Sequence, residues 1–142
     1  MVVENKRLEK TCCFYVSEFH LEMILLPYIN EKIEEEITVL TEKDLTETLG
    51  ILISKMNLKE ENKQKIIELG WKKENKIKEK SNIIVVGSKK YIIEKNKEIE
   101  EFNPLTVLDC YNFEEEKDNI NLIVEKYNNT LNTLGKNKFC KF

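Results

Sequence analysis

The chain is poor in several residue types that catalytic and nucleotide-binding motifs require. Its 142 residues include four glycines, one arginine (Arg7), one histidine (His20) and no alanine. Bidentate guanidinium contacts are available only from Arg7, which excludes a cysteine phosphatase loop with an arginine downstream of its thiol. A single histidine excludes histidine-based triads and multi-histidine metal sites, though not one acid–base role. The few glycines form neither the phosphate loop GxxxxGK[ST] nor the dinucleotide fingerprint GxGxxG.

The chain also lacks long apolar runs and an excess of positive charge. Charged residues make up 35% of the sequence, yet the formal net charge is only -3, which argues against a nucleic-acid partner. No segment approaches the roughly twenty apolar residues that span a bilayer, and the first residues, MVVENKRLEK, lack the apolar core of a signal peptide. We therefore expect a cytoplasmic protein without a membrane partner. The abundant lysine is typical of an AT-rich genome, so solvated surface is its default role.

None of the four cysteines, Cys12, Cys13, Cys110 and Cys140, is spaced as CxxC. In a reducing compartment they are expected to be free thiols. Cys12 and Cys13 are adjacent on a predicted strand and should point to opposite faces. A metal site combining Cys12, Cys110 and His20 is geometrically imaginable, but no ligand spacing supports it. The sequence therefore predicts no metal and no cofactor.

Short apolar runs alternate with amphipathic stretches along the chain. The runs are TCCFYV (11–16), ITVL (37–40), NIIVVG (82–87) and LTVLDCY (105–111). The stretch between the last two, KKYIIEKNKEIEEF, has helical periodicity, which gives a β-α-β unit. We predict an α/β fold: one three-layer domain over residues 1–142, with a mainly parallel sheet of four to five strands and helices on both faces. The ends, approximately 1–9 and 135–142, are expected to be flexible.

Three details of this assignment are open to test. A helix begins near Glu18 after the cap Ser17 and is expected to kink or restart at Pro27. The segment from Lys59 to Trp71 is either helical throughout or ends in a short edge strand. The last helix is predicted from roughly Glu114 to Leu131, with one apolar face that comprises Ile120, Ile123, Val124, Tyr127 and Leu131.

Parallel sheets bind ligands at the carboxyl ends of their strands, so functional residues are sought there. The amides of Gly87 and Ser88 could hold an anion at a helix N-terminus, although a tight turn and a helix cap are the favoured roles. Cys110 could act as a nucleophile if a neighbour lowered its pKa, but packing in the core is favoured. Asp109 resembles the acidic residues of receiver domains, without their partner carboxylates. The full set of candidate ligand-binding residues is Tyr15, Ser17, His20, Thr41, Gly87, Ser88, Asp109, Cys110 and Tyr111.

Two segments resemble a known family. CCFYVSEFHLEMILLPYINEKIEEEITVLTEKD is similar to the opening of the MEDS domain, the sensory module of methanogen and methylotroph regulators: a cysteine-containing strand that ends in Tyr, a helix with an apolar-Pro-aromatic step, and a strand that leads into an acidic loop. GSKKYIIEKNKEIEEFNPLTVLDCYNF resembles the later helix and strand of that family, with Cys110 and Tyr111 in the matching positions. The family's histidine before the first strand falls at Lys10, and the region between Trp71 and Ser81 is shorter here. The resemblance implies a RecA-like fold without a phosphate loop, used as a sensory or regulatory module.

Three functions follow from these observations. The first is a noncatalytic sensory or regulatory module that binds a small molecule or protein partner at the carboxyl edge of the sheet. The second is a small enzyme that uses Cys110, with Asp109, or Ser88 at that edge. The third is an interaction subunit that assembles through a sheet edge or through the helix from Glu114 to Leu131, which leaves a homodimer open.

Overall fold

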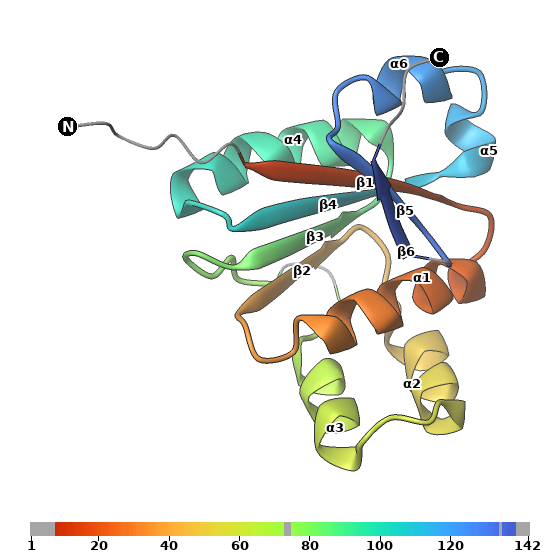
Figure 1. Ribbon diagram of the computed structural model, residues 1–142, viewed down its shortest axis with the longest axis vertical. Helices are drawn as coiled ribbons and strands as arrows, with labels where there is room; N and C mark the ends of the chain where they lie inside the picture. Colours follow the sequence, from red (N-terminus) through yellow and green to blue (C-terminus); the bar gives the residue numbers. More distant parts are fainter. Residues whose placement is uncertain (1–7, 73–74, 134, 139–142) are drawn as a thin grey trace.

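The computed structural model describes residues 8–72, 75–133 and 135–138 (Figure 1). In chain order the elements are β1 (Glu9–Tyr15), α1 (Glu18–Glu31), β2 (Ile37–Thr41), α2 (Thr46–Lys55), α3 (Glu60–Glu68), β3 (Asn82–Val86), α4 (Lys89–Ile99), the short 3-10 helix η1 (Glu100–Phe102), β4 (Thr106–Asn112), α5 (Phe113–Glu116), α6 (Ile120–Val124), β5 (Asn129–Asn132) and β6 (Gly135–Lys138).

The strands form one sheet in the order β2-β3-β4-β1-β5-β6. All neighbours pair in parallel except β5 and β6, which are antiparallel. β1 lies inside the sheet beside β4, with Tyr15 opposite Asn112 at their carboxyl ends. The predicted α/β fold with a mainly parallel sheet is confirmed.

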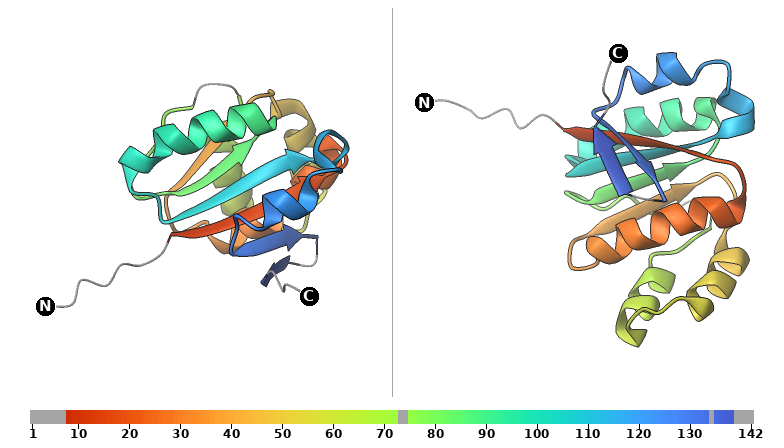
Figure 2. Two further views of the ribbon diagram at one scale, coloured as in Figure 1. Left: turned by 90° about the horizontal axis from the view of Figure 1, so that it is seen from above. Right: turned by 45° about the vertical axis from the view of Figure 1, so that its right-hand side comes forward.

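Helices cover both faces of the sheet. α1, α2 and α3 pack on one face, called here the α1 face, while α4 and α6 pack on the other, the α4 face (Figures 1 and 2). The alternation along β4 divides its side chains between the two cores: Leu108 and Cys110 belong to the α1 face, Val107 and Tyr111 to the α4 face. Period-2 alternation therefore decides which side of the sheet each polar residue of β4 can serve.

The prediction of one long last helix is wrong. Residues 113–116 and 120–124 form two short helices, and the chain then joins the sheet as β5 and β6. Asn128 causes the change of direction: its N–H donates to the Lys10 carbonyl at 2.8 Å, and its side chain accepts from the Lys10 N–H at 2.8 Å. Leu131 consequently packs on the α1 face, opposite Ile123 and Tyr127. The residues predicted to form one helical face therefore belong to different elements: Ile120, Ile123 and Val124 lie in α6, whereas Leu131 lies in β5.

The C-terminal tail also differs from the expectation of a loose end. Gly135–Lys138 is a strand that pairs with β5, with Gly135 opposite Asn132. Gly135 has φ 115°, a backbone conformation that favours glycine and lets the chain reverse here. The five parallel strands agree with the predicted four to five, and β6 adds a sixth, antiparallel strand. The parts of the two predicted flexible ends before residue 8 and after residue 138 lie outside the described residues.

Two further predictions concern the helix around Pro27 and the segment from Lys59 to Trp71, and the exposure of their residues explains the outcome. α1 continues through Pro27, which has no N–H to donate to the Met23 carbonyl. Met23 and Pro27 both lie on the solvent side of α1, where water can hydrate that carbonyl. α3 is a helix, and Trp71 follows it without a strand. The Trp71 indole is fully buried and donates to the Ile66 carbonyl at 2.8 Å, which fixes the end of α3 against the α1-face core.

Candidate functional site

The carboxyl ends of β1 and β4 mark the point at which the chain leaves the sheet in opposite directions. After Tyr15 the chain enters α1 on one face, whereas β4 leads through α5 to α6 on the other face. Adjacent parallel strands whose connections diverge in this way open a crevice between them, which is the usual ligand position in open α/β sheets. The topology therefore predicts a ligand site at the carboxyl ends of β1 and β4.

A crevice of about 40 Å³ lies at this position. That volume holds a few water molecules or one small polar head group. We call it the strand-end crevice; it is lined by Tyr15, Glu18, Leu21, Glu42, Lys43, Leu45, Val86, Gly87, Ser88, Asn112 and Glu115. Its lining includes the carboxylates of Glu18, Glu42 and Glu115 and a single lysine, so it favours a cationic group.

The anion site considered as the less favoured role of Gly87 and Ser88 is occupied by the protein's own Glu42 carboxylate. The Glu42 carboxylate accepts the Ser88 backbone N–H at 2.8 Å, and the Ser88 hydroxyl accepts the Tyr91 N–H at 3.3 Å as the α4 cap. Glu42 takes the position that an external phosphate would need at the positive helix end. The favoured roles of Gly87 and Ser88, a tight turn and a helix cap, match this geometry.

Gly87 is required by the close approach of Glu42 and Tyr91. A Cβ at position 87 would lie 2.6 Å from Tyr91 Cδ2 and 2.9 Å from Glu42 Oε1. We expect Gly87→Ala to displace Glu42 and to lower the free energy of unfolding by about 1–2 kcal/mol, measured by urea denaturation. Gly50→Ala is the matched control: its Cβ would meet no atom within 4 Å inside α2, so it should stabilise by about 0.5–1 kcal/mol. Equal stability of Gly87→Ala and the wild type would contradict the close packing of Glu42.

Tyr15 is the largely buried polar residue of the crevice whose hydroxyl has no hydrogen-bond partner among the described residues. Its side chain is 7% exposed and its ring belongs to the α1-face core. Among the described residues, its hydroxyl accepts no hydrogen bond and donates none. Burial, followed by the nearby Cys110 and Glu115, raises the pKa of Tyr15, so the hydroxyl stays protonated and can donate or accept.

Three predicted site residues serve local structure beside the crevice. The Ser17 hydroxyl accepts the His20 N–H at 3.1 Å as the α1 cap, and His20 Nδ1 accepts the Val16 N–H at 3.0 Å. The Thr41 hydroxyl is buried and donates to the Lys43 carbonyl at 2.7 Å, which shapes the turn after β2. None of these three side chains lines the crevice.

Asp109, Cys110 and Tyr111 do not converge at the edge, because strand alternation separates them. Cys110 is fully buried on the α1 face, and burial together with the neighbouring Cys13 raises its pKa. An inaccessible neutral thiol is not a nucleophile, so the catalytic role considered for Cys110 is not supported. Asp109 and Tyr111 lie within the α4 face.

The cysteine metal site is excluded by the same geometry. Cys12 packs on the α4 face, whereas Cys13 and Cys110 pack on the α1 face. No group of three or more potential ligand side chains gathers within the described ranges. The three cysteines that the structure describes are free thiols, and Cys140 lies outside those ranges.

A second polar arrangement lies inside the α4 face. Tyr127 donates to Asp109 Oδ2 at 2.6 Å, Asn96 Nδ2 lies 3.1 Å from Asp109 Oδ1, and the Tyr111 and Tyr127 hydroxyls are 2.5 Å apart. Since Tyr127 uses its proton on Asp109, Tyr111 must donate to Tyr127. Burial raises the pKa of Asp109, while Tyr127, Asn96 and Lys10 partly offset that rise. The Asp109 carboxyl is therefore a structural centre rather than an open metal or phosphate ligand.

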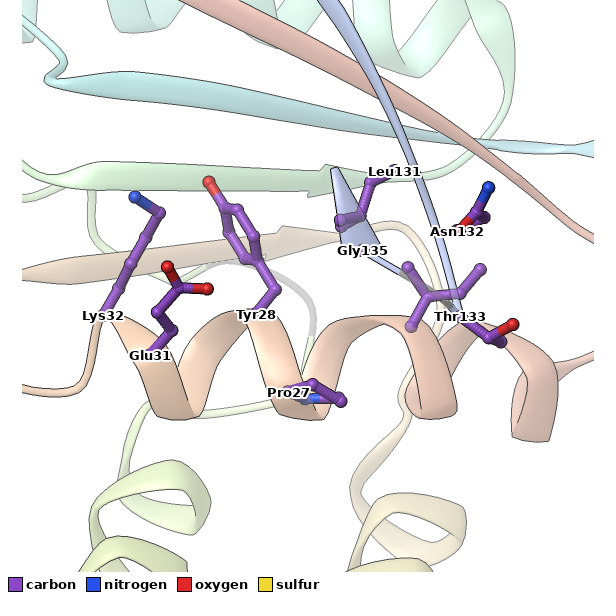
Figure 3. A pocket seen from close by; sticks show the side chains of 9 residues that line it. Pro27, Tyr28, Glu31, Lys32, Leu131, Asn132, Thr133 and Gly135 are labelled. Carbon is purple, nitrogen blue, oxygen red and sulfur yellow. The ribbon is translucent and has the colours of Figure 1, made fainter. Parts of the chain in front are cut away.

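Another hollow, of about 260 Å³, lies between α1 and the β5–β6 hairpin (Figure 3). Tyr28, Glu31 and Lys32 extend from α1, and Leu131, Asn132 and Thr133 form the other wall. Its one lysine and one glutamate balance in charge, and the Tyr28 hydroxyl lies 3.4 Å from the Thr106 hydroxyl. It therefore offers less specific chemistry than the crevice.

Sequence reasoning located part of the crevice and missed its acidic members. Tyr15, Gly87 and Ser88 were predicted and line it; the acidic Glu18, Glu42 and Glu115, and the neutral Asn112, were not. Asn112 and Glu115 directly follow β4, so their distance from a strand end was the available signal. The contact between Glu42 and Ser88 joins residues 46 positions apart and leaves no local pattern.

The fold and site define an open α/β domain with a crevice at the divergence of β1 and β4. Comparisons of the chain with protein-family models, curated proteins and solved structures found no match. Over the described ranges, no helix is long and apolar enough to cross a membrane.

Proposed function

We propose that the protein is a noncatalytic sensory or regulatory module that binds a cationic group, from a small molecule or a protein partner, in the strand-end crevice. The observation that carries this proposal is the Tyr15 side chain, which lines the crevice with three carboxylates and whose hydroxyl has no hydrogen-bond partner among the described residues. A ligand ammonium or guanidinium would give this hydroxyl and the carboxylates a charge-assisted hydrogen-bond partner. The resemblance to MEDS sensory domains agrees with a noncatalytic role and stays a prediction.

The alternatives have less support. Among the candidate nucleophiles, Cys110 is buried and Ser88 is committed to the α4 cap, so the edge lacks an activated group. Assembly through the β2 edge is opposed because Asn75 Nδ2 donates to the Val39 carbonyl at 2.8 Å and occupies that edge. The long C-terminal helix proposed for assembly is divided into α5 and α6.

The proposal predicts selective binding of small cations. In ¹H–¹⁵N NMR titrations of the full chain, ethylamine, putrescine and arginine should shift the resonances of Tyr15, Ser88 and Glu115, whereas acetate should not. Glu115→Gln should weaken this binding at least tenfold, because it removes a crevice carboxylate. Glu114→Gln is the matched control, since Glu114 pairs with Lys117 at 3.4 Å and does not line the crevice.

Tyr15→Phe separates binding from folding. Because the Tyr15 hydroxyl has no hydrogen bond in the described chain, its removal should leave the urea midpoint unchanged or slightly higher while weakening amine binding. Amines that bind the wild type and Tyr15→Phe equally well, or that shift no crevice resonance, would refute the proposed site.

A further inference from the structure

A groove of about 170 Å³ is lined by residues from β1, β4, α4 and α6 and from the segment that follows α6. α4 and α6 cover the face of the sheet opposite α1 (Figure 2). We call this groove the lysine groove; it is formed by Lys10, Lys89, Lys97 and Lys126 around Tyr111 and Tyr127. It is separate from the strand-end crevice, with which it shares no lining residue.

The charge of the groove is opposite to that of the whole chain. The chain has a net charge of -3, yet the groove brings together four lysines and one acid, Glu100. Within the described ranges, none of these four lysines forms an ion pair, whereas Lys95, also on α4, pairs with Glu98 at 3.0 Å. Lys10 is held over the Tyr127 ring, 5.3 Å from its centroid. Like charges gathered around a hollow repel one another, so this arrangement favours an anion between them.

The floor of the groove is apolar in character although it contains two tyrosines. The hydroxyls of Tyr111 and Tyr127 are used in the chain of hydrogen bonds to Asp109. The rings, which meet edge to face with centroids 6.2 Å apart, and the side chains of Ile92 and Ile123 therefore contribute apolar surface. Recognition of charge is left to the lysines at the rim.

We propose that the lysine groove is a second binding site, which takes a small organic anion: a ring of about benzene size that carries a carboxylate or phosphate group. The ring would pack on the tyrosine and isoleucine floor, and the anionic group would lie among the lysines. The groove has the size for this, because a protein cavity of about 150 Å³ accommodates benzene. An ion without a ring would leave the apolar floor uncovered and should bind less tightly.

The test is an NMR titration of the full chain at low salt with phenyl phosphate, benzoate, inorganic phosphate, benzyl alcohol and benzylamine. Phenyl phosphate or benzoate should shift the resonances of Tyr111, Ile123 and Tyr127 and bind at least tenfold more tightly than inorganic phosphate, benzyl alcohol or benzylamine. The pair of anions distinguishes the two head groups, since either one alone satisfies the proposal and reports which group is preferred.

The double variant Lys97→Gln/Lys126→Gln should weaken anion binding at least tenfold. Both lysines are exposed, so the variant is expected to keep the wild-type fold, which its spectrum will report. Lys90→Gln, an exposed α4 position outside the groove, is the matched control and should bind like the wild type.

Equal binding of benzyl alcohol and phenyl phosphate, unchanged binding in the double variant, or the absence of shifts at the groove would overturn the proposal. The strand-end crevice is tested with amines and with Tyr15 and Glu115 variants, which differ from the ligands and variants used here. The proposal for either site can therefore be refuted without changing the result at the other.

Discussion

Replacing Asp109 by alanine should lower the free energy of unfolding by about 3 kcal/mol, one of the two largest changes we expect in this chain. The carboxyl is fully buried and accepts hydrogen bonds from Tyr127 and Asn96. Its loss would leave the buried Tyr127 hydroxyl without its acceptor and the half-buried Asn96 amide with only the Ile92 carbonyl as acceptor. Urea denaturation at pH 7 measures the change.

Asp118→Ala is the control, because Asp118 is exposed and its replacement should cost less than about 0.5 kcal/mol. Tyr127→Phe should itself cost about 1–2 kcal/mol, and the double variant should cost at least about 1 kcal/mol less than the sum of the two single changes. Additive effects, or an Asp109→Ala variant as stable as Asp118→Ala, would show that the chain of hydrogen bonds does not exist in solution.

The behaviour of β4 shows which level of structure the sequence could predict. The apolar run LTVLDCY identified a buried strand, and Asp109, Cys110 and Tyr111 were correctly placed on it. Grouping them in one site was wrong because consecutive residues of a strand face opposite layers. Strand identity is a local property of composition, whereas the partner of a buried polar group depends on the element packed on that face.

The C-terminal segment shows the same limit for helices. Ile120, Ile123, Val124 and Tyr127 do have helical spacing, and the structure begins with a helix there. The end of that helix is decided by the two hydrogen bonds between Asn128 and Lys10, which are 118 positions apart in the chain. Hydrogen bonds between distant parts of the chain thus outweighed the local helical periodicity. The hydrogen bond from the Ser88 N–H to Glu42 is likewise a long-range contact that local sequence does not predict.

Glu22 is a buried carboxyl group that has no role in the fold or in the proposed sites. Its side chain is 0% exposed in α1, and neither carboxylate oxygen has a hydrogen-bond partner among the described atoms. Burial is the main cause that raises the pKa of Glu22; the nearby Glu18 adds to the rise and Thr48 opposes it. A carboxyl without a partner in such surroundings favours its neutral form.

We expect Glu22→Met to stabilise the protein by about 1–3 kcal/mol at pH 7, because a side chain of similar length would replace an unpartnered carboxyl with apolar contacts. The advantage should depend on pH with a definite sign. The folded pKa of Glu22 lies above its unfolded value of about 4.3, so the folded state binds the proton more tightly. The stabilisation of the folded wild type by this tighter proton binding is complete below about pH 4.3, and it is lost as pH rises through the raised folded pKa of Glu22.

The gain from Glu22→Met should therefore be smallest near pH 4, grow with pH, and become constant above the folded pKa. Urea denaturation between pH 4 and 8 measures this difference between variant and wild type, which cancels the contribution of Asp109, whose raised pKa acts with the same sign. Glu31→Gln, an exposed position of α1, is the control and should change the free energy of unfolding at pH 7 by less than about 0.5 kcal/mol. A Glu22→Met variant that is less stable than the wild type at pH 7, and whose disadvantage shrinks as pH falls through about 4, would mean that the Glu22 carboxylate is ionised and paired in solution. The packing of α1 against α2 would then have to admit a partner for it.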